Sequence, residues 1–255
     1  MSALLIGLAT TLVFCAPGYP GAAQDAQPVL DSFARQAAAA AHWPAGELTA
    51  LYDPTEEGGL EKLASPRAAL AFVPYPFFVR HATRLHLVPL AQADVTAVGI
   101  QQRWTLMAKR GRIAGPDALA GYRILSVAGY APEFVRGVAL AHWHLPESTK
   151  IEPTGQILGD LRRIAGGDAV TALLDQEQTA ASASLPFVSE LQAVVQSPPL
   201  PVALIAVVDA RLPEPRAAAL RTALVGLSHS SAGAAALEGL RLRGFVSPQL
   251  PAAAP

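Results

Sequence analysis

The chain has 255 residues, of which 51% are apolar and 15% are charged, and its formal net charge is −1. This composition excludes an intrinsically disordered chain, and the lack of a basic block argues against nucleic acid or an anionic membrane surface as a partner. The single cysteine, Cys15, excludes an internal disulfide and a thiolate metal cluster.

The first ten residues have the character of a remnant secretory signal. Residues 1–9 are apolar and end in small side chains, with Gly7 and Ala9 placed as in a cleavage site, but the basic start and the longer apolar core of such a signal are missing. A plain buried strand is the alternative, and lipid attachment at Cys15 is another. No apolar run reaches the roughly 18 residues of a membrane-spanning helix.

The first part of the chain predicts alternating strands and helices. A β-rich apolar run at 11–16 is the first strand, and the turn cluster at 17–21 follows it. The continuous apolar run at 68–73 is typical of a buried parallel strand. The other elements expected here are a helix at 22–42, a strand at 48–52, a short helix opened by Thr55, an aromatic loop at 74–78 and a strand at 85–91.

The second part of the chain continues the alternation. A stiff Pro-rich connector is expected at 197–201. Strands are expected at 102–108, 123–127, 150–153, 170–174, 191–195 and 202–208, and helices at 116–119, 132–143, 155–165, 178–184, 215–227 and 231–240.

This alternation predicts an α/β fold with mainly parallel sheets flanked by helices. The strand around Trp104 is not followed at once by a full helix, as a crossover would be, and the connector at 197–201 can return the chain to its first half. We therefore expect two lobes joined by a hinge with two crossings. Lobe 1 would contain residues 11–101 plus 196–255, and lobe 2 residues 102–195.

The loop between the strand at 123–127 and the helix that opens with Pro132 predicts the chemistry of a ligand. Loops at the carboxyl ends of strands bind ligands in open α/β sheets, and a helix N-terminus favours an anion. Here Glu133 already supplies negative charge, and the loop offers Val127 and Ala128 in place of hydroxyl groups. We expect a ligand that is less charged than phosphate.

Four segments, in this order and spacing, carry a resemblance to a known family. They are LVFCAPGYPG at 12–21, AFVPYPFF at 71–78, Ser126 with GYAP at 129–132, and LLD at 173–175 with Gln178. Together they resemble the phosphonate-binding type of periplasmic substrate-binding proteins of ABC transporters, a branch of the type 2 periplasmic-binding fold. The resemblance implies a periplasmic protein of two lobes that hands its ligand to an ABC permease.

The resemblance also implies where the ligand lies, because in that family loops at the strand ends hold it between the lobes. The positions that match are Tyr19, Tyr75, Phe77, Ser126, Gly129, Tyr130, Asp175 and Gln178. Each has a structural alternative: Phe77 is equally suited to a core beneath the sheet, and Asp175 to capping the helix that follows it. The family's loop is rich in Ser and Thr where this chain has Val127 and Ala128.

From these residues we expect a non-enzymatic solute-binding protein that closes about its hinge on a small ligand. The ligand is expected to be uncharged or largely apolar, lipid-like molecules included. A phosphate- or phosphonate-type oxyanion, a sensor subunit without ligand, and an enzyme that uses Asp175 and Glu133 are the alternatives. We expect no cofactor and no metal, because His142 and His144 have no evident third ligand, and we expect a monomer with no nucleic-acid partner.

Overall fold

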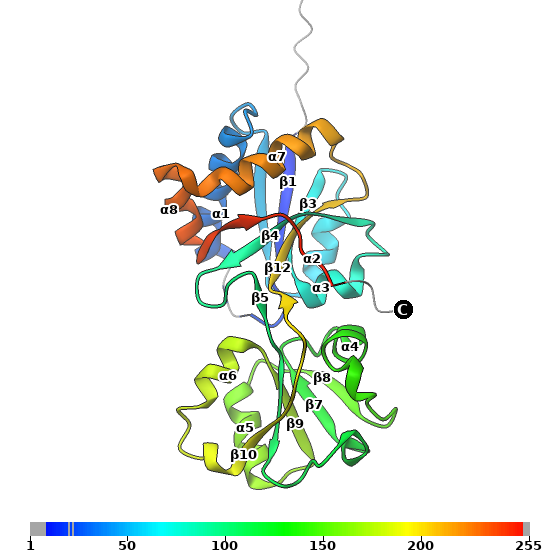
Figure 1. The fold of residues 1–255 in the computed structure, drawn as a ribbon. Helices are drawn as coiled ribbons and strands as arrows, with labels where there is room; N and C mark the ends of the chain where they lie inside the picture. The colour runs from blue at the N-terminus through cyan, green and yellow to red at the C-terminus, as the bar shows by residue number, and fades with distance from the viewer. Residues whose placement is uncertain (1–8, 20, 22, 252–255) are drawn as a thin grey trace, which may run out of the picture.

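The computed structural model describes residues 9–19, 21 and 23–251. Two mixed β-sheets flanked by helices form two lobes, one above the other in Figure 1. In lobe 1 the strands lie in the order β13 (Leu242–Val246), β4 (Leu87–Val95), β12 (Ala203–Val208), β3 (Ala68–Pro74), β1 (Thr10–Cys15) and β2 (Leu48–Asp53).

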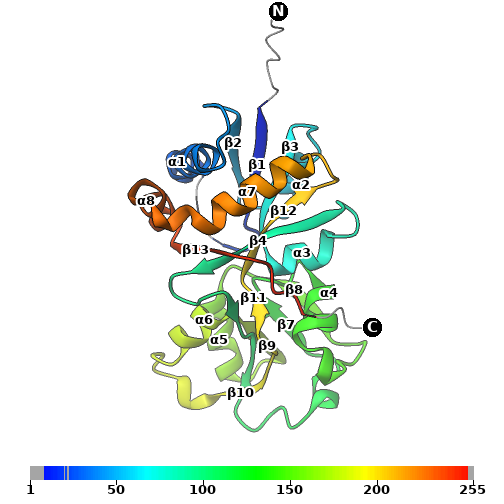
Figure 2. The same ribbon diagram turned by 45° about the horizontal axis from the view of Figure 1, so that its top comes forward.

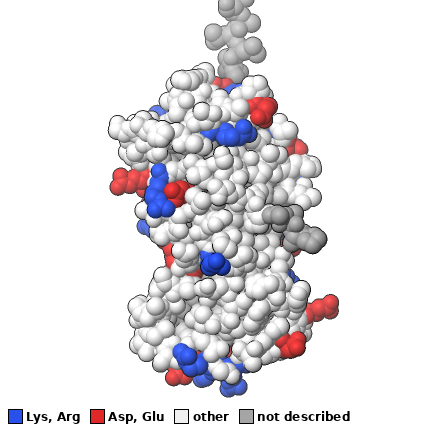
Figure 3. All heavy atoms as spheres, viewed as in Figure 1, with Lys and Arg blue, Asp and Glu red and all other residues white. Residues whose placement is uncertain are grey.

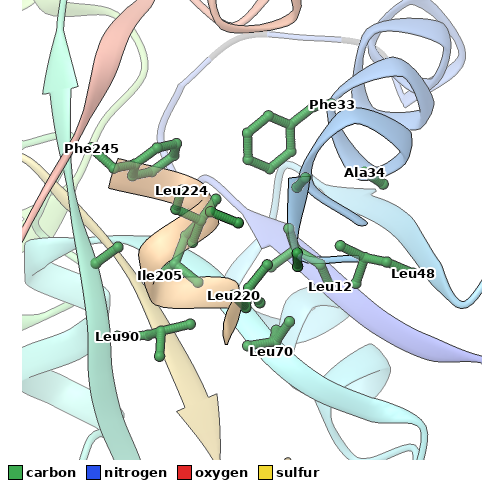
Figure 4. Packing of buried hydrophobic residues seen from close by; sticks show 14 of the residues in the cluster. Leu12, Phe33, Ala34, Leu48, Leu70, Leu90, Ile205, Leu220, Leu224 and Phe245 are labelled. Carbon is green, nitrogen blue, oxygen red and sulfur yellow. The ribbon is translucent and has the colours of Figure 1, made fainter. Parts of the chain in front are cut away.

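Helices cover both faces of the lobe 1 sheet. Side chains alternate along β1, so Leu12 and Phe14 point to one face, while Val13 and Cys15 point to the other. The first face packs against α1 (Ala23–Ala40), α7 (Glu214–Gly226) and α8 (Ser231–Gly239), and Figure 4 shows this core around Leu12. The second face packs against α2 (Glu56–Leu63) and α3 (Tyr75–His81).

Lobe 2 is built on a second sheet with its own core. The strands lie in the order β10 (Leu191–Gln196), β6 (Thr105–Lys109), β9 (Val170–Leu174), β7 (Arg123–Ser126) and β8 (Lys150–Pro153). Its helices are α4 (Pro132–Phe134), α5 (Ile157–Gly166) and α6 (Gln176–Ser182), and α4 continues as a π-turn over Val135–Ala139. Short 3-10 turns lie at Pro116–Leu119, Ala141–Trp143 and Val188–Glu190, and at Leu227–His229 in lobe 1.

The chain passes between the lobes at β5 (Gln101–Gln102), labelled in Figure 1, and at β11 (Leu200–Pro201), labelled in Figure 2, and the two strands pair antiparallel. Polar contacts fix the two crossings to each other. Arg103 Nη1 donates to the Ser197 carbonyl at 2.8 Å, and the backbone N–H of Trp104 donates to Ser197 Oγ at 2.9 Å. The crossing strands are therefore a bonded pair rather than loose linkers.

The sheets are mixed, which corrects the expectation of mainly parallel sheets. β1 is parallel to β2 and β3, and β7 is parallel to β8 and β9. The pairs made by β12, by β13 and by β6 are antiparallel. The physical reason is connectivity: β6 and β12 enter their sheets directly from the hinge, without the crossover helix that a parallel neighbour requires.

Two local predictions are also corrected. The aromatic segment after β3 is not a loop but the helix α3, which begins at Tyr75 after the extended residue Pro74 and has Pro76 in its first turn, where proline is tolerated. The segment Leu242–Val246 was assigned no element and forms the edge strand β13. Its Gly244 interrupts the apolar alternation from which a strand is recognised.

The start of the chain tests part of the signal prediction. Residues 1–8 of the predicted signal segment 1–10 lie outside the described residues, whereas Thr10 belongs to β1 and pairs with Leu48. Cys15 is 1% exposed and its Sγ donates to the Thr55 carbonyl, so in this structure it is an interior strand residue. In the described part of the chain, every helix is too short or too polar to cross a bilayer.

Charged side chains are scattered over the surface. On the face seen in Figure 3, Lys and Arg lie interspersed with Asp and Glu, without a large patch of either sign. This distribution agrees with the net charge of −1 and offers no extended electrostatic surface on that face.

Candidate functional site

A cavity of about 230 Å³ lies between the lobes, and we call it the interlobe cavity. It opens where β1, β2, β3 and β4 reach their carboxyl ends, opposite the N-terminus of α6 in lobe 2. That edge of a sheet is where open α/β folds bind ligands. Its wall includes Phe14, Cys15, Tyr19, Tyr52, Phe72, Val95, Val98, Gln102, Asp175, Glu177 and Val202.

The lobe 1 side of the interlobe cavity is an aromatic wall that continues into the core. The ring centroid of Phe14 lies 5.0 Å from that of Phe72 and 5.8 Å from that of Phe33, with the rings nearly edge to face. Phe72 in turn lies 5.9 Å from Phe245. Edge-to-face packing holds these rings in place, so the wall is rigid and apolar.

The polar side of the interlobe cavity is a hydrogen bond between the lobes. The Tyr19 hydroxyl, in the loop after β1, donates to Asp175 Oδ2 at 3.2 Å. Asp175 caps α6: its Oδ1 accepts from the backbone N–H of Gln178 at 2.8 Å, and Gln178 Oε1 accepts from the backbone N–H of Asp175 at 3.1 Å. This reciprocal capping box fixes the carboxylate toward Tyr19.

Burial shifts the pKa values of both members of this pair in the same direction. It raises the pKa of the Tyr19 hydroxyl well above its usual range, and the negative charge of Asp175 adds to that shift. Burial also raises the pKa of Asp175, although its hydrogen bonds act in the opposite direction. Tyr19 is thus a proton donor at any physiological pH. Among the described residues on the wall, none is Lys, Arg or His, so nothing there compensates an anionic ligand.

Two of the predicted aromatic ligands pack elsewhere. Tyr75 is 6% exposed, and its ring meets Phe134 of lobe 2 edge to face with 6.1 Å between centroids. Phe77 is fully buried between α3 and the lobe 1 sheet, where it lies against His81. The structure therefore places Tyr75 in a packed contact between lobes and Phe77 in the core, and neither lines the interlobe cavity.

The predicted residues of the β7 loop serve the backbone. Ser126 is fully buried; its Oγ donates to the Leu173 carbonyl at 2.7 Å and accepts from the backbone N–H of Ala128 at 3.1 Å. A Cβ on Gly129 would collide with the Glu152 carbonyl, so the loop needs glycine to pack against β8. Ser126 and Gly129 hold the loop in shape and do not face the interlobe cavity.

Tyr130 and Gln178 lie at two other hollows. Tyr130 lines a second cavity of about 290 Å³ between the lobes, with Gly18 and Glu56, and its buried hydroxyl has no hydrogen-bond partner among the described residues. Burial raises the pKa of that hydroxyl well above its usual range. Gln178 lines a groove between α5 and α6 on the outside of lobe 2. Of the predicted residues, only Tyr19 and Asp175 therefore meet at the interlobe cavity.

A second link between the lobes involves Glu133. Its Oε2 lies 2.9 Å from Arg80 Nη1, and Arg80 Nε lies 2.7 Å from Glu56 Oε1, which His81 Nε2 also contacts at 2.6 Å. Glu133 does not line the interlobe cavity, so the two carboxylates of the enzyme alternative do not converge there. Within the described residues, no group of three or more His, Cys, Asp or Glu side chains could hold a metal ion.

The sequence analysis did not predict five residues of the cavity wall: Phe14, Tyr52, Phe72, Val98 and Gln102. Phe14 and Phe72 look like ordinary core positions of apolar strands. Tyr52 carried a usable signal, because it stands at the carboxyl end of a predicted strand that neighbours the first one. Gln102 opened a predicted strand, and nothing local marked it.

Solved structures resemble this chain, whereas no protein-family model and no curated protein matches its sequence. XAC2383 from Xanthomonas citri, bound to ATP, has a TM-score of 0.68 and 16% identity over 96% of this chain and 92% of its own. A binding protein component of an ABC phosphonate transporter from Pseudomonas aeruginosa has a TM-score of 0.62 and 13% identity, covering 94% and 82%. PhnD1 from Prochlorococcus marinus, in complex with methylphosphonate, has a TM-score of 0.58 and 12% identity, covering 94% and 93%.

These similarities confirm the predicted fold: the chain has the two-lobe α/β fold of periplasmic binding proteins. At 12–16% identity they establish the fold alone. The phosphonate-binding type is one branch among several that superpose, because an ancestral arginine-binding protein also does so, with a TM-score of 0.52 and 11% identity.

Proposed function

We propose that this protein is an extracytoplasmic solute-binding protein that captures a small, uncharged or largely apolar ligand in the interlobe cavity and presents it to an ABC permease. The observation that carries the proposal is an apolar cavity bounded by both lobes, with the Tyr19–Asp175 hydrogen bond at its edge. The likeness to a binding component of an ABC phosphonate transporter supports the transport role. No covalent chemistry is part of the proposal.

The size and the lining of the interlobe cavity support this class of ligand. Its volume of about 230 Å³ is smaller than the roughly 300–1,000 Å³ of sites for drug-sized molecules. The rings of Phe14, Tyr52 and Phe72 offer contacts to an alkyl or aromatic body. A phosphonate would instead meet the carboxylates of Asp175 and Glu177 with no cation nearby on the described wall.

Hinge closure would couple binding to recognition by the permease. Tyr19 belongs to lobe 1 and Asp175 to lobe 2, so a ligand beside them contacts both lobes only when the lobes are together. A ligand shifts an equilibrium between conformations only through such a difference in contact. The permease would then recognise the closed arrangement.

Native mass spectrometry of gently purified protein tests the proposal, followed by calorimetric titration with methylphosphonate. We expect a bound neutral compound that dissociates on activation, and no saturable heat with methylphosphonate. Val98→Trp, which fills the cavity, should abolish the bound mass, whereas Val88→Trp on the exposed side of β4 should retain it. A ligand-free mass together with tight methylphosphonate binding would overturn the ligand class.

A further inference from the structure

Gln102 is a buried polar residue at the hinge. It is the second residue of β5, opposite Leu200 of the returning crossing, and only 5% of it is exposed. Gln102 is one of the residues that form the wall of the interlobe cavity. It is thus more than nine-tenths buried and adjoins the space proposed for the ligand.

The side-chain amide of Gln102 is not used in hydrogen bonding within the described residues, whereas two other polar side chains near the hinge are paired. The Gln92 amide donates to the Ile100 carbonyl at 2.6 Å, and the Arg103 guanidinium donates to the Ser197 carbonyl at 2.8 Å. Within the described residues, the Gln102 side chain takes part in no hydrogen bond. A primary amide carries two N–H donors and a carbonyl acceptor, and buried polar groups are nearly always paired.

The other buried polar side chain on the wall is already engaged. Asp175 Oδ1 accepts from the backbone N–H of Gln178, and Oδ2 accepts from the Tyr19 hydroxyl. The Cys15 thiol donates to the Thr55 carbonyl. Among the buried polar residues of this wall, Gln102 is therefore the one whose side-chain donor and acceptor are not used by a hydrogen bond within the described residues, and they stay available to a ligand.

We propose that Gln102 recognises the polar group of the ligand, and that this group is a neutral amide, such as a carboxamide or lactam, on a small apolar body. The inference rests on the proposed function of the interlobe cavity. An amide presents a donor beside an acceptor and so matches both groups of Gln102 at once. A carboxylate would leave the Gln102 carbonyl unmatched and face Asp175, and an ammonium group would leave the Gln102 N–H groups unmatched.

The position of Gln102 also links recognition to the hinge. Because β5 pairs with β11, a ligand held by Gln102 touches the crossing itself as well as both lobes. A hydrogen bond formed there in the closed arrangement adds to the difference in contact that favours closure.

Isothermal titration calorimetry with four matched probes tests the inference. Benzamide offers the donor and the acceptor, acetophenone the acceptor alone, benzoate an anion and benzylamine a cation, all on one phenyl ring. We expect wild-type protein to prefer benzamide over acetophenone by about tenfold, as for the one additional hydrogen bond that the benzamide N–H donates to the Gln102 carbonyl at a buried site. Gln102→Met, of similar length without polar atoms, should reduce that preference to about one.

Gln101→Met is the matched control, because Gln101 lies on the same hinge strand, pairs with Pro201 and is not on the cavity wall. It should keep the wild-type preference, and thermal unfolding of each variant checks the fold. Equal binding of benzamide and acetophenone by wild type, or a preference that survives Gln102→Met, overturns the inference and leaves the proposed function standing. A preference for benzoate or benzylamine also overturns the inference about Gln102. If none of the four probes binds and methylphosphonate binds tightly, both the inference and the proposed function are overturned.

Discussion

Two strand-end regions of this protein face the gap between the lobes, and they have opposite roles. The loop after β7 in lobe 2 carries Ser126 and Gly129, and its side chains and glycine are used in holding the backbone. The strand ends of lobe 1 carry Phe14 and Tyr52, and they leave a cavity between them. A position at the carboxyl end of a sheet therefore makes a region a candidate ligand site. Whether the region has room for a ligand depends on how its side chains pack.

The difference arises from the size of the side chains at each strand end. Small residues such as Ala128 and Gly129 let the lobe 2 loop pack directly on its neighbours, and the Val127 carbonyl approaches Gly18 so closely that a Cβ there would collide with it. The large rings at the lobe 1 strand ends, those of Phe14, Tyr52 and Phe72, instead line the interlobe cavity together with Asp175 and Glu177 of lobe 2. The sequence alone does not predict that the lobe 2 loop is filled and the lobe 1 strand ends are open, because this difference depends on how the two lobes pack together.

The largest expected effect is a loss of unfolding free energy on truncation of a core residue, compared with truncation of a residue on the cavity wall. Phe77→Ala should lower the free energy of unfolding by about 3–5 kcal/mol, because it removes a fully buried ring from the lobe 1 core. Phe77→Ala should leave the interlobe cavity lined as before. Urea denaturation followed by circular dichroism measures the change. A loss below about 1 kcal/mol, as for Val98→Ala on the cavity wall, would show that Phe77 is no core residue.

The next largest effect tests the tight packing of the lobe 2 loop. Gly129→Ala should lower the free energy of unfolding by about 2 kcal/mol, because its Cβ would collide with the backbone of Glu152 and Pro153. Gly155→Ala is the control, since no atom lies within 4 Å of the Cβ it would add. Equal stability of the two variants in thermal and urea unfolding would mean that the loop has room for a ligand after all.

Much of the fold could be predicted from the sequence, because proline, glycine and apolar runs mark element ends. The two lobes were predicted correctly from two features: the strand around Trp104 has no helix directly after it, and a Pro-rich connector lies at 197–201. The helix α3 could not be predicted, because Pro74 and Pro76 both indicate a turn when their backbone conformations are unknown. Mixed pairing in the sheets was equally hidden, since it follows from where the hinge strands insert.

The candidate site was predictable only in part. Tyr19 and Asp175 follow predicted strands, and the structure brings them together across the lobes at 3.2 Å. Ser126 was chosen for its hydroxyl, but a hydroxyl in a tight loop serves neighbouring backbone groups equally well. Gln102 gave no signal, because its side chain becomes notable only when burial and the absence of partners within the described residues are known.

A smaller effect tests the charge at the polar edge of the cavity. Asp175→Asn should change the free energy of unfolding by only about 1 kcal/mol near neutral pH, because Asn also caps helices well. Its pH dependence carries the information. Burial raises the pKa of Asp175 in the folded state, so the folded state binds more protons than the unfolded one, and wild-type stability falls as pH rises from about 4 through the folded pKa.

The variant lacks this group, so its stability relative to wild type should rise with pH across that window and level off above it. Urea titrations at closely spaced pH values measure the difference. Asp168→Asn, an exposed carboxylate of lobe 2 paired with Arg163, is the control. A difference that falls with rising pH would mean that a cation stabilises the Asp175 carboxylate, contrary to the lining of the cavity.

The smallest effect concerns the ion pair between Arg80 and Glu133. Glu133 is largely exposed, and exposed pairs contribute about 0–1 kcal/mol, so Glu133→Gln should hardly change the free energy of unfolding.

The pair joins the two lobes, however, so its loss should increase the distance between them. We expect small-angle scattering to give a larger radius of gyration for Glu133→Gln than for wild type, whereas Asp168→Asn, whose pair with Arg163 lies within lobe 2, should match wild type. Raising the salt concentration should expand the wild type toward the variant, because screening weakens an exposed pair. If the variant and wild type scatter identically at low salt, the lobes are held together by the packed rings of Tyr75 and Phe134 and by the Tyr19–Asp175 hydrogen bond. The contacts at and near the interlobe cavity, and not the Arg80–Glu133 ion pair, would then determine whether the lobes close.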